Sequence, residues 1–320
     1  MKRALITGIA GFAGSHLAAH LLSRGWGVSG IERPGAPCAN LDGIGPVRVE
    51  KADILDAAAV GRAVADVAPD AVFHLAAVTF LPSVEDSPRE ALDVNAGGTL
   101  VLLEACRRHA PAARFILASS SEVYGKVPPE GMPVREDRRP APANVYAFTK
   151  LCAEEAVRFY ARAHGLSAVV LRPFNHIGPR QAPSFVASSF ARQVAEIEAG
   201  MKEPVVSVGN LDAERDFTDV RDMVRAYALA AERCAPGGIY NIGAGRPLRV
   251  GRMLEMLIAL SSARIEVRRD PARLRKSDTP VLYGDSAKFA AATGWRPEHP
   301  IEETLRLILD WWRARVAARA

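Results

Sequence analysis

Cysteine is scarce in this 320-residue sequence. The few cysteines stand far apart in the chain, and no two of them form a Cys-x-x-Cys pair. This spacing argues against a zinc site and against a disulfide framework. The sequence therefore predicts no bound metal and a reduced compartment, most simply the cytoplasm. The four cysteines are Cys38, Cys106, Cys152 and Cys234.

Long apolar runs and blocks of like charge are also absent. The chain has no stretch of about 18 consecutive apolar residues, so we expect no membrane span. Residues 1–22 contain two basic residues before an apolar run, as a signal peptide would, but three evenly spaced glycines argue against that interpretation. The formal net charge of +5 comes mostly from scattered arginines. It predicts a mild attraction for small anions such as a diphosphate, and no nucleic-acid partner.

Strand and helix patterns alternate regularly through the first part of the chain. Short runs of β-branched or aliphatic residues lie between amphipathic segments that end at glycine or proline. Continuous apolar strands separated by helices predict a parallel sheet covered on both faces, which is a doubly wound α/β fold. The predicted strands are residues 4–7, 28–31, 47–49, 71–76, 115–118 and 168–171, and the clearest helices are residues 15–24 and 56–67.

The alternation is lost after about residue 173. Long loops separate the predicted elements in this part of the chain. We therefore place a first domain at residues 1–173 and a smaller, partly discontinuous second domain at residues 174–320, with a possible return to the first domain near residues 209–245. The later elements are helices at 185–199, 221–233, 252–260 and 301–316, and strands at 205–208 and 239–242.

Three glycines directly follow the first predicted strand and open the first helix. This context turns a glycine spacing into a prediction of phosphate binding. Glycine permits a tight turn and a close approach of a pyrophosphate to the helix N-terminus, where unpaired N–H groups favour an anion. We expect Gly8, Gly11, Phe12 and Gly14 to bind a dinucleotide. The alternative is a glycine-rich turn without a ligand.

The second strand ends at Glu32 and Arg33, where the residue that contacts the adenosine ribose is expected. A carboxylate would accept a hydrogen bond from a free 2′-hydroxyl and repel a 2′-phosphate, whereas a guanidinium would bind the phosphate. NAD and NADP therefore both stay open as cofactors. Asp53, after the third strand, is placed to meet the adenine amino group, and a turn or capping role is the alternative.

Tyr146 and Lys150 stand four residues apart in a predicted helix, so their side chains share one face. The ammonium group is expected to stabilise the phenolate and to lower the pKa of the tyrosine. Such a tyrosine can transfer a proton at neutral pH. Ser120 follows the strand at 115–118, at the carboxyl edge where open α/β sheets bind ligands, and can hydrogen-bond a substrate oxygen there. The alternatives are a serine in an ordinary turn and two unrelated neighbours on a helix.

Four further segments accompany these residues, namely 73–77 (FHLAA), 95–99 (NAGGT), 120–125 (SSEVYG) and 215–220 (RDFTDV). Together with the three-residue glycine spacing, Tyr146 and Lys150, they make the whole chain resemble the extended short-chain dehydrogenases/reductases that act on nucleotide sugars. The resemblance implies a Rossmann-type domain that binds NAD(H) or NADP(H), with Ala76 among its cofactor-binding residues. It also implies a smaller C-terminal domain that binds the substrate, and a homodimer formed through helices near residues 94–108 and 146–164.

Three segments resemble the GDP-mannose branch of this family, and they span residues 172–180, 209–216 and 274–278. The resemblance implies that Arg215 and Arg275 contact the nucleotide, that Asn175 lines the substrate cleft and that Asp278 also binds the substrate. A guanidinium suits a diphosphate because it donates two parallel hydrogen bonds, although surface arginines are commonly solvated. Relatives usually carry Arg-Pro-x-Glu in the third segment. In this chain Lys276 replaces the proline and Asp278 replaces the glutamate.

The segment at 172–180 most resembles reductases that convert GDP-4-keto-6-deoxy-D-mannose to GDP-D-rhamnose, with Tyr146 as the proton donor. Glu122 leaves a second activity open, because the related GDP-mannose 4,6-dehydratases carry a glutamate there that removes the proton from sugar carbon 5. Ser120 stands where those dehydratases have threonine. A catalytically silent dinucleotide sensor on the same fold is the alternative from another functional class.

Overall fold

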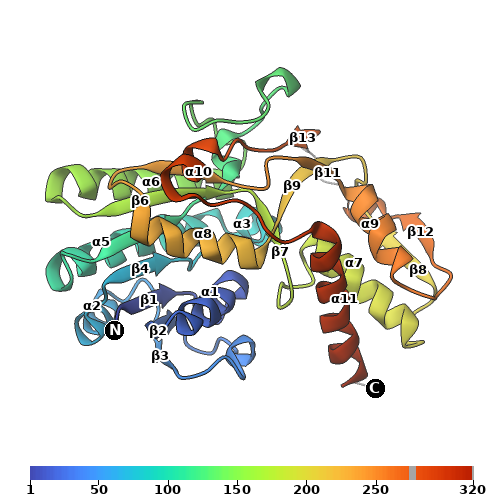
Figure 1. The fold of residues 1–320 in the computed structure, drawn as a ribbon, viewed down its shortest axis with the longest axis horizontal. Helices are drawn as coiled ribbons and strands as arrows, with labels where there is room; N and C mark the ends of the chain where they lie inside the picture. Colours follow the sequence, from blue (N-terminus) through green and yellow to red (C-terminus); the bar gives the residue numbers. More distant parts are fainter. Residues whose placement is uncertain (274–278, 319–320) are drawn as a thin grey trace.

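The computed structural model describes residues 1–273 and 279–318. The strands of its main sheet are β1 (Arg3–Thr7), β2 (Gly27–Glu32), β3 (Val47–Lys51), β4 (Ala71–His74), β5 (Arg114–Ala118), β6 (Ala168–Pro173) and β10 (Ile239–Ile242). They are all parallel and lie in the order β10-β6-β5-β4-β1-β2-β3 (Figure 1). The order changes direction between β1 and β4, which places a ligand crevice at the carboxyl ends of these strands. The doubly wound α/β prediction is confirmed.

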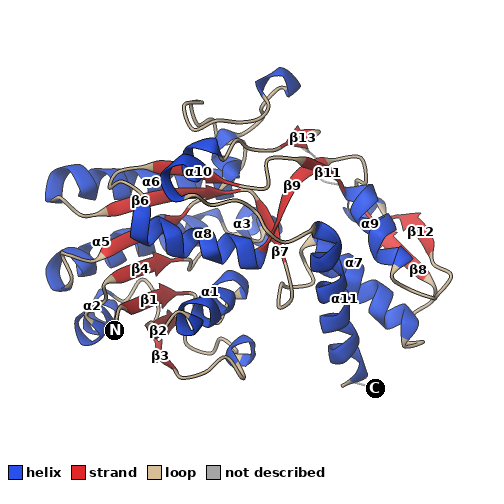
Figure 2. Ribbon diagram, in the orientation of Figure 1, coloured by secondary structure: helices blue, strands red, loops and turns tan. Residues whose placement is uncertain are grey.

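Helices cover both faces of the main sheet, as Figure 2 shows. One face packs against α1 (Phe12–Ser23), α8 (Val220–Arg233) and α10 (Ala287–Thr293), and these elements share one apolar core with the strands. The other face packs against α2 (Ala57–Val67), α5 (Gly98–His109) and α6 (Val145–His164) through a second apolar core. Because the central strands of the main sheet are buried on both faces, their sequences are continuous runs of apolar residues.

A second group of elements lies to one side of the main sheet (Figure 1). The helices α7 (Val186–Glu198), α9 (Val250–Ala259) and α11 (Ile301–Ala317) surround a third apolar core. Two small sheets accompany them, in which β9 pairs with β7, β11 and β13, and β12 pairs with β8. Their strands are β7 (Asn175–Ile177), β8 (Val205–Val208), β9 (Glu214–Asp219), β11 (Pro247–Arg249), β12 (Glu266–Arg269) and β13 (Val281–Leu282).

The structure differs from the predicted elements mainly by additions. The sequence prediction missed the short strands β7, β11, β12 and β13, the strand β9, and the helices α3 (Leu81–Asp86), α4 (Pro88–Leu92) and α10. Two or three partly exposed residues carry too little apolar periodicity to be recognised as a strand. The strand at 239–242 pairs with β6 and therefore belongs to the main sheet, as the sequence had allowed.

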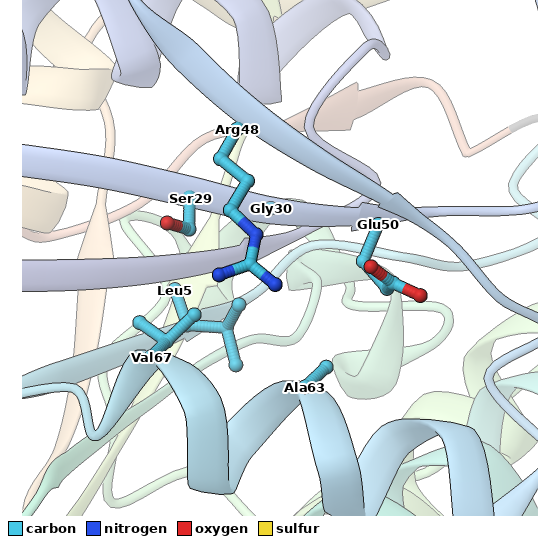
Figure 3. A pocket seen from close by; sticks show the side chains of 7 residues that line it. All are labelled: Leu5, Ser29, Gly30, Arg48, Glu50, Ala63 and Val67. Carbon is cyan, nitrogen blue, oxygen red and sulfur yellow. The ribbon is translucent and has the colours of Figure 1, made fainter.

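A small cavity lies between β2, β3 and α2 (Figure 3). Its volume of about 10 Å³ is about that of a single water probe, so no dinucleotide or sugar fits there. Leu5, Ala63 and Val67 form its apolar side, and Arg48 and Glu50 lie at the polar side. Among the residues described, no helix combines the length and apolar character needed to cross a bilayer.

Candidate active site

Two N-terminal caps determine the positions of Ser120 and Tyr146. Ser120 is itself one of the caps, and Tyr146 follows the other. Ser120 caps the 3-10 turn Ser121–Tyr124 that follows β5, and its Oγ accepts a hydrogen bond from the Glu122 N–H at 3.1 Å. Asn144 caps α6, and its Oδ1 accepts from the Ala147 N–H at 2.8 Å. These side chains satisfy N–H groups that a helix leaves unpaired at its start. Ser120 therefore fixes the start of the turn after β5, and Asn144 fixes the first turn of α6, which contains Tyr146.

The Tyr146 hydroxyl forms a hydrogen bond with the Ser120 side chain. Burial raises the pKa of Tyr146 above its usual value, the Ser120 hydrogen bond lowers it, and the nearby Glu122 carboxylate raises it further. The prediction of a lowered tyrosine pKa is therefore wrong, because the loss of hydration outweighs the stabilisation of the phenolate in this position. Tyr146 is protonated at neutral pH and can act as a proton donor.

Lys150 lies one turn after Tyr146 and is buried. Its Nζ donates a hydrogen bond to the carbonyl oxygen of Ala118 at 2.7 Å. Burial lowers the pKa of Lys150 to about 8, and the Glu154 carboxylate opposes this shift. The side chain therefore still carries its positive charge at neutral pH, and loses it as the pH rises through about 8.

Glu122 lies beside these residues and is held in place by Asn144. The Asn144 Nδ2 donates a hydrogen bond to Glu122 Oε2 at 3.2 Å. Asn144 therefore connects the turn after β5 to the start of α6 in addition to capping that helix. Sequence reasoning missed this residue, although an asparagine two positions before Tyr146 is a recognisable helix-capping signal.

The glycine loop has the close backbone contacts that a phosphate-binding turn requires. Gly8 adopts a positive φ of 68°, which is favoured by glycine. A Cβ atom on Gly14 would lie 2.2 Å from the Gly8 carbonyl oxygen, so only glycine allows α1 to pack this closely on the loop. No side chain of the described residues caps the amino end of α1. Its N–H groups and its dipole are therefore available to an anion, and the loop fits a dinucleotide diphosphate.

The end of β2 carries a carboxylate that faces the glycine loop. Glu32 Oε2 accepts a hydrogen bond from the Ala10 N–H at 3.0 Å, and Oε1 accepts from the Arg33 N–H at 3.1 Å. The Arg33 side chain is exposed. Asp53 is also exposed, and its Oδ1 accepts from the Leu55 N–H at 2.9 Å, which is the turn role that the sequence left open.

A buried polar network connects the floor of the glycine loop to α6. The Ala76 N–H donates to Thr7 Oγ1, which contacts His74 Nδ1 at 2.7 Å. On its other side His74 contacts Thr99, whose hydroxyl donates to the carbonyl oxygen of Asn95. Burial lowers the pKa of His74 to about 3, so this histidine is neutral. It relays hydrogen bonds between strand and helix and titrates only in acid.

Asn95 completes the connection to the helix that carries Tyr146. Its Nδ2 donates to Thr149 Oγ1 at 2.9 Å, and the Thr149 hydroxyl donates to the Tyr146 carbonyl oxygen at 2.8 Å. From the segments 73–77 and 95–99 the sequence predicts a role only for Ala76, and it does not predict these hydrogen bonds of His74, Asn95 and Thr99. Their hydrogen bonds connect the cofactor loop to the backbone of Tyr146.

The predicted substrate residues lie on the small sheet beside the crevice. Asn175 is on β7, and Arg215 is on the neighbouring strand β9. The Arg215 Nη1 donates to the carbonyl oxygens of Glu214 and Pro280. His176 stacks on Phe12 of α1 with ring planes 9° apart, which connects this segment to the glycine loop. Arg275 and Asp278 lie outside the described residues.

Comparisons with known proteins agree with this arrangement. The family model described as GDP-mannose 4,6 dehydratase matches residues 5–308. The GDP-6-deoxy-D-mannose reductase of Pseudomonas aeruginosa is 36% identical over 98% of this chain and 98% of that protein. The GDP-mannose 4,6-dehydratase of Yersinia enterocolitica is 31% identical over 95% of this chain and 91% of that protein.

A solved structure of similar shape is that of RMD from Pseudomonas aeruginosa complexed with NADPH. Its TM-score is 0.85 and its identity 33%, and the match covers 98% of this chain and all of that chain. The family model and the identity to the curated relatives agree with the predicted resemblance. The chain therefore belongs to the GDP-mannose 4,6-dehydratase family within the extended short-chain dehydrogenases/reductases.

Proposed function

We propose that this protein reduces GDP-4-keto-6-deoxy-D-mannose to GDP-D-rhamnose with NADPH or NADH. The observation that carries the proposal is Tyr146, which burial keeps protonated and which Ser120 holds by a hydrogen bond. Reduction of a ketone needs a proton donor, whereas dehydration begins with removal of a proton from a hydroxyl group. The similarity to the reductase of Pseudomonas aeruginosa over nearly the full length supports the same activity.

Each residue of the proposed mechanism has one role. A nicotinamide dinucleotide held by the glycine loop and Lys150 would supply the hydride that carbon 4 of the sugar accepts. Ser120 hydrogen-bonds the carbonyl oxygen, and Tyr146 gives its proton to this oxygen as negative charge develops there. The Lys150 ammonium, one helical turn away, stabilises the tyrosinate that is left. The buried position of Lys150 keeps water away from this charge and strengthens its effect.

The same proposal assigns two separate sets of residues to the two ligands, the dinucleotide and the GDP-linked sugar. The diphosphate of the dinucleotide is bound by Gly8, Gly11, Phe12 and Gly14. Ala76 lies beneath the dinucleotide, and Lys150 contacts its ribose. Asn175, Arg215, Arg275 and Asp278 bind the GDP-linked sugar. The first group belongs to a cofactor domain at residues 1–173, with a possible return near 209–245, and the second group to a domain that takes up most of residues 174–320.

Dehydration of GDP-mannose is the competing activity, because Glu122 lies beside Tyr146 and influences its pKa. Two incubations separate the two reactions. With GDP-4-keto-6-deoxy-D-mannose we expect one NADPH or NADH oxidised per sugar reduced, and with GDP-mannose and no added reductant we expect no 4-keto product. A 4-keto product from GDP-mannose assigns the dehydratase activity, and no turnover in either incubation supports the non-catalytic sensor.

Glu32 is expected to favour NADH over NADPH. Its carboxylate is fixed by the Ala10 N–H beside the proposed ribose position, where it would repel a 2′-phosphate. We expect Glu32→Ser to raise kcat/KM for NADPH relative to NADH by about tenfold, which corresponds to roughly 1.4 kcal/mol. Steady-state kinetics with both cofactors measure this ratio. An unchanged ratio would show that Glu32 does not influence cofactor choice.

We also propose that the chain forms a homodimer through α5 and α6. These helices expose three large apolar side chains, since Leu100 is 45% exposed, Phe148 51% and Phe159 52%. Phe148 and Phe159 are eleven residues apart, so they lie on one face of α6. A contiguous apolar patch on such a face would mark a protein interface. We expect light scattering to give a dimer mass, and Phe159→Glu to give a monomer. Met201→Glu is the matched control, since Met201 is equally exposed but lies just beyond α7.

The cytoplasmic location stays a prediction from cysteine content. All four cysteines are free thiols in the structure.

A further inference from the structure

The last residue of β5 and the two residues that follow it each contact one of three residues on α6 that are four positions apart. The pairs are Ala118 with Lys150, Ser119 with Glu154, and Ser120 with Tyr146. Residues four apart lie one above another on a helix, so the three contacts fall on successive turns of one face of α6. Two of these contacts involve residues that the proposed mechanism already uses. The third, between Ser119 and Glu154, has no role in that mechanism.

Glu154 is a buried carboxylate whose position is determined from two sides. The Ser119 hydroxyl donates a hydrogen bond to its Oε1 at 2.5 Å. From β6, Arg172 donates from Nε to Oε1 at 2.9 Å and from Nη2 to Oε2 at 2.6 Å. Both charged side chains are almost completely buried. A two-pronged contact of this kind fixes the orientation of a carboxylate as well as its place.

Arg172 extends the contact to the far end of the catalytic turn. Its Nη1 donates to the Tyr124 hydroxyl at 3.0 Å, and Tyr124 donates in turn to Asn241 Oδ1 at 2.6 Å. Tyr124 is the last residue of the 3-10 turn that begins after Ser120. The ion pair therefore supports both ends of the segment that carries Ser120, and it connects that segment to β6 and β10.

The charge of Glu154 also acts on Lys150. A buried ammonium is destabilised because it has lost its hydration, and a carboxylate one turn away opposes this loss. The same carboxylate also forms the ion pair with Arg172. His74 on β4 interacts with Lys150 through charge as well, and it stays neutral, so it adds no second positive charge near Lys150. The other charged or titratable groups near Lys150 on α6 are Tyr146, Cys152, Glu154 and Glu155, and the elements packed against α6 carry Arg172 on β6, Glu122 and Tyr124 on the turn after β5, Glu85 and Asp86 on α3, Arg89 and Glu90 on α4, Asp93 between α4 and α5, and Glu104, Cys106, Arg107, Arg108 and His109 on α5.

We infer that Glu154 is a positioning residue of the reaction, which holds the Ser120 segment against α6 through Ser119 and keeps a negative charge one turn from Lys150. The inference rests on the proposed function, because its effect on turnover is exerted through Ser120 and Lys150. The two effects can be separated, since one depends on a hydrogen bond and the other on a charge.

Glu154→Gln removes the charge and retains an oxygen that can accept from Ser119. We expect the pKa of Lys150 to fall by about one unit, and the high-pH limb of kcat/KM to move down by the same amount. NMR titration of the lysine side chains measures this pKa, and Lys150→Arg identifies the Lys150 signal among the seven lysines of the chain. Glu154→Asp, which restores the charge, should restore the titration.

Ser119→Ala removes the hydrogen bond and leaves every charge in place. We expect kcat to fall about tenfold or more, because a small displacement of a group that touches the substrate is costly, while the pH profile stays where it is. A wild-type kcat in this variant would show that Ser119 does not hold the segment.

Glu198→Gln is the matched control for loss of an ion pair. Glu198 on α7 receives two hydrogen bonds from Arg313, both at 2.7 Å, and lies outside the main sheet. We expect this variant to keep the wild-type pH profile. If Glu154→Gln does not fold, Glu154→Gln combined with Arg172→Met removes both buried charges and should still lower the Lys150 pKa.

An unchanged Lys150 pKa in the folded Glu154→Gln variant, alone or combined with Arg172→Met, would overturn the charge effect. The NMR measurement needs no substrate, so it is independent of the proposed reaction. A wild-type protein that does not reduce the 4-keto sugar would overturn the proposed function and leave the titration result intact.

Discussion

Tyr146→Phe is expected to lower kcat for the 4-keto sugar by about 100-fold to 10,000-fold, the usual contribution of a general acid. Phenylalanine keeps the aromatic ring and its packing but removes the only proton that this side chain can donate. The hydroxyl also forms the hydrogen bond with Ser120, so its loss leaves the ketone oxygen with a single donor. Oxidation of NADPH or NADH in the presence of the keto sugar measures the effect.

Binding and a second tyrosine provide the controls for this variant. The dissociation constant of the dinucleotide should not change, because the glycine loop is the proposed binding site of its diphosphate. Tyr160→Phe, on the same helix, removes a hydroxyl that contacts Glu104 at 3.3 Å and should keep wild-type turnover. If Tyr146→Phe retained the wild-type rate, the proton would have to come from another group.

Gly14→Ala is expected to weaken dinucleotide binding by about 10-fold to 100-fold. The added Cβ would lie 2.2 Å from the Gly8 carbonyl oxygen and 2.9 Å from the Ile9 Cα, and both are backbone atoms. Overpacking of this kind costs about 1–3 kcal/mol. The strain is relieved only if α1 moves away from the loop, which displaces the N–H groups that bind the diphosphate. Fluorescence titration with the dinucleotide measures the affinity.

Gly61→Ala is the matched control for a glycine within a helix. Gly61 lies in α2, and the nearest atoms to an added Cβ belong to the His109 ring at 3.6 Å or more. Alanine in a helix interior is favoured over glycine by about 1 kcal/mol. We therefore expect unchanged affinity and an equal or higher melting temperature. Wild-type affinity in Gly14→Ala would show that the loop tolerates a wider separation from α1.

The main sheet could be predicted from the sequence because its strands are buried on both faces. Apart from the edge strand β3, these strands are mostly short apolar runs, and glycine or proline ends the clearest predicted helices between them. Most strands of the second part have only two to four residues, and the four residues of β12 are all exposed. Their positions depend on pairing with distant segments, which a local pattern does not contain.

The placement of Tyr146 and Lys150 could be predicted from the sequence, but their electrostatics could not. The spacing of Tyr146 and Lys150 correctly places both on one face of α6. The direction of the tyrosine pKa depends on burial, which is a property of the assembled fold. Arg172 and Glu154 were missed for a related reason, because charged residues are mostly exposed and only their pairing across the fold allows both to be buried.

The position of β10 has a consequence for synthesis of the chain. This strand completes one edge of the main sheet, and α8, which precedes it, covers the same face as α1. A ribosome must therefore release more than two thirds of the polypeptide before β10 can pair with β6 and α8 can cover the apolar face of the main sheet. A fragment that ends after β6 would expose the unpaired edge of that strand and the uncovered side chains beneath α8, and both features promote aggregation.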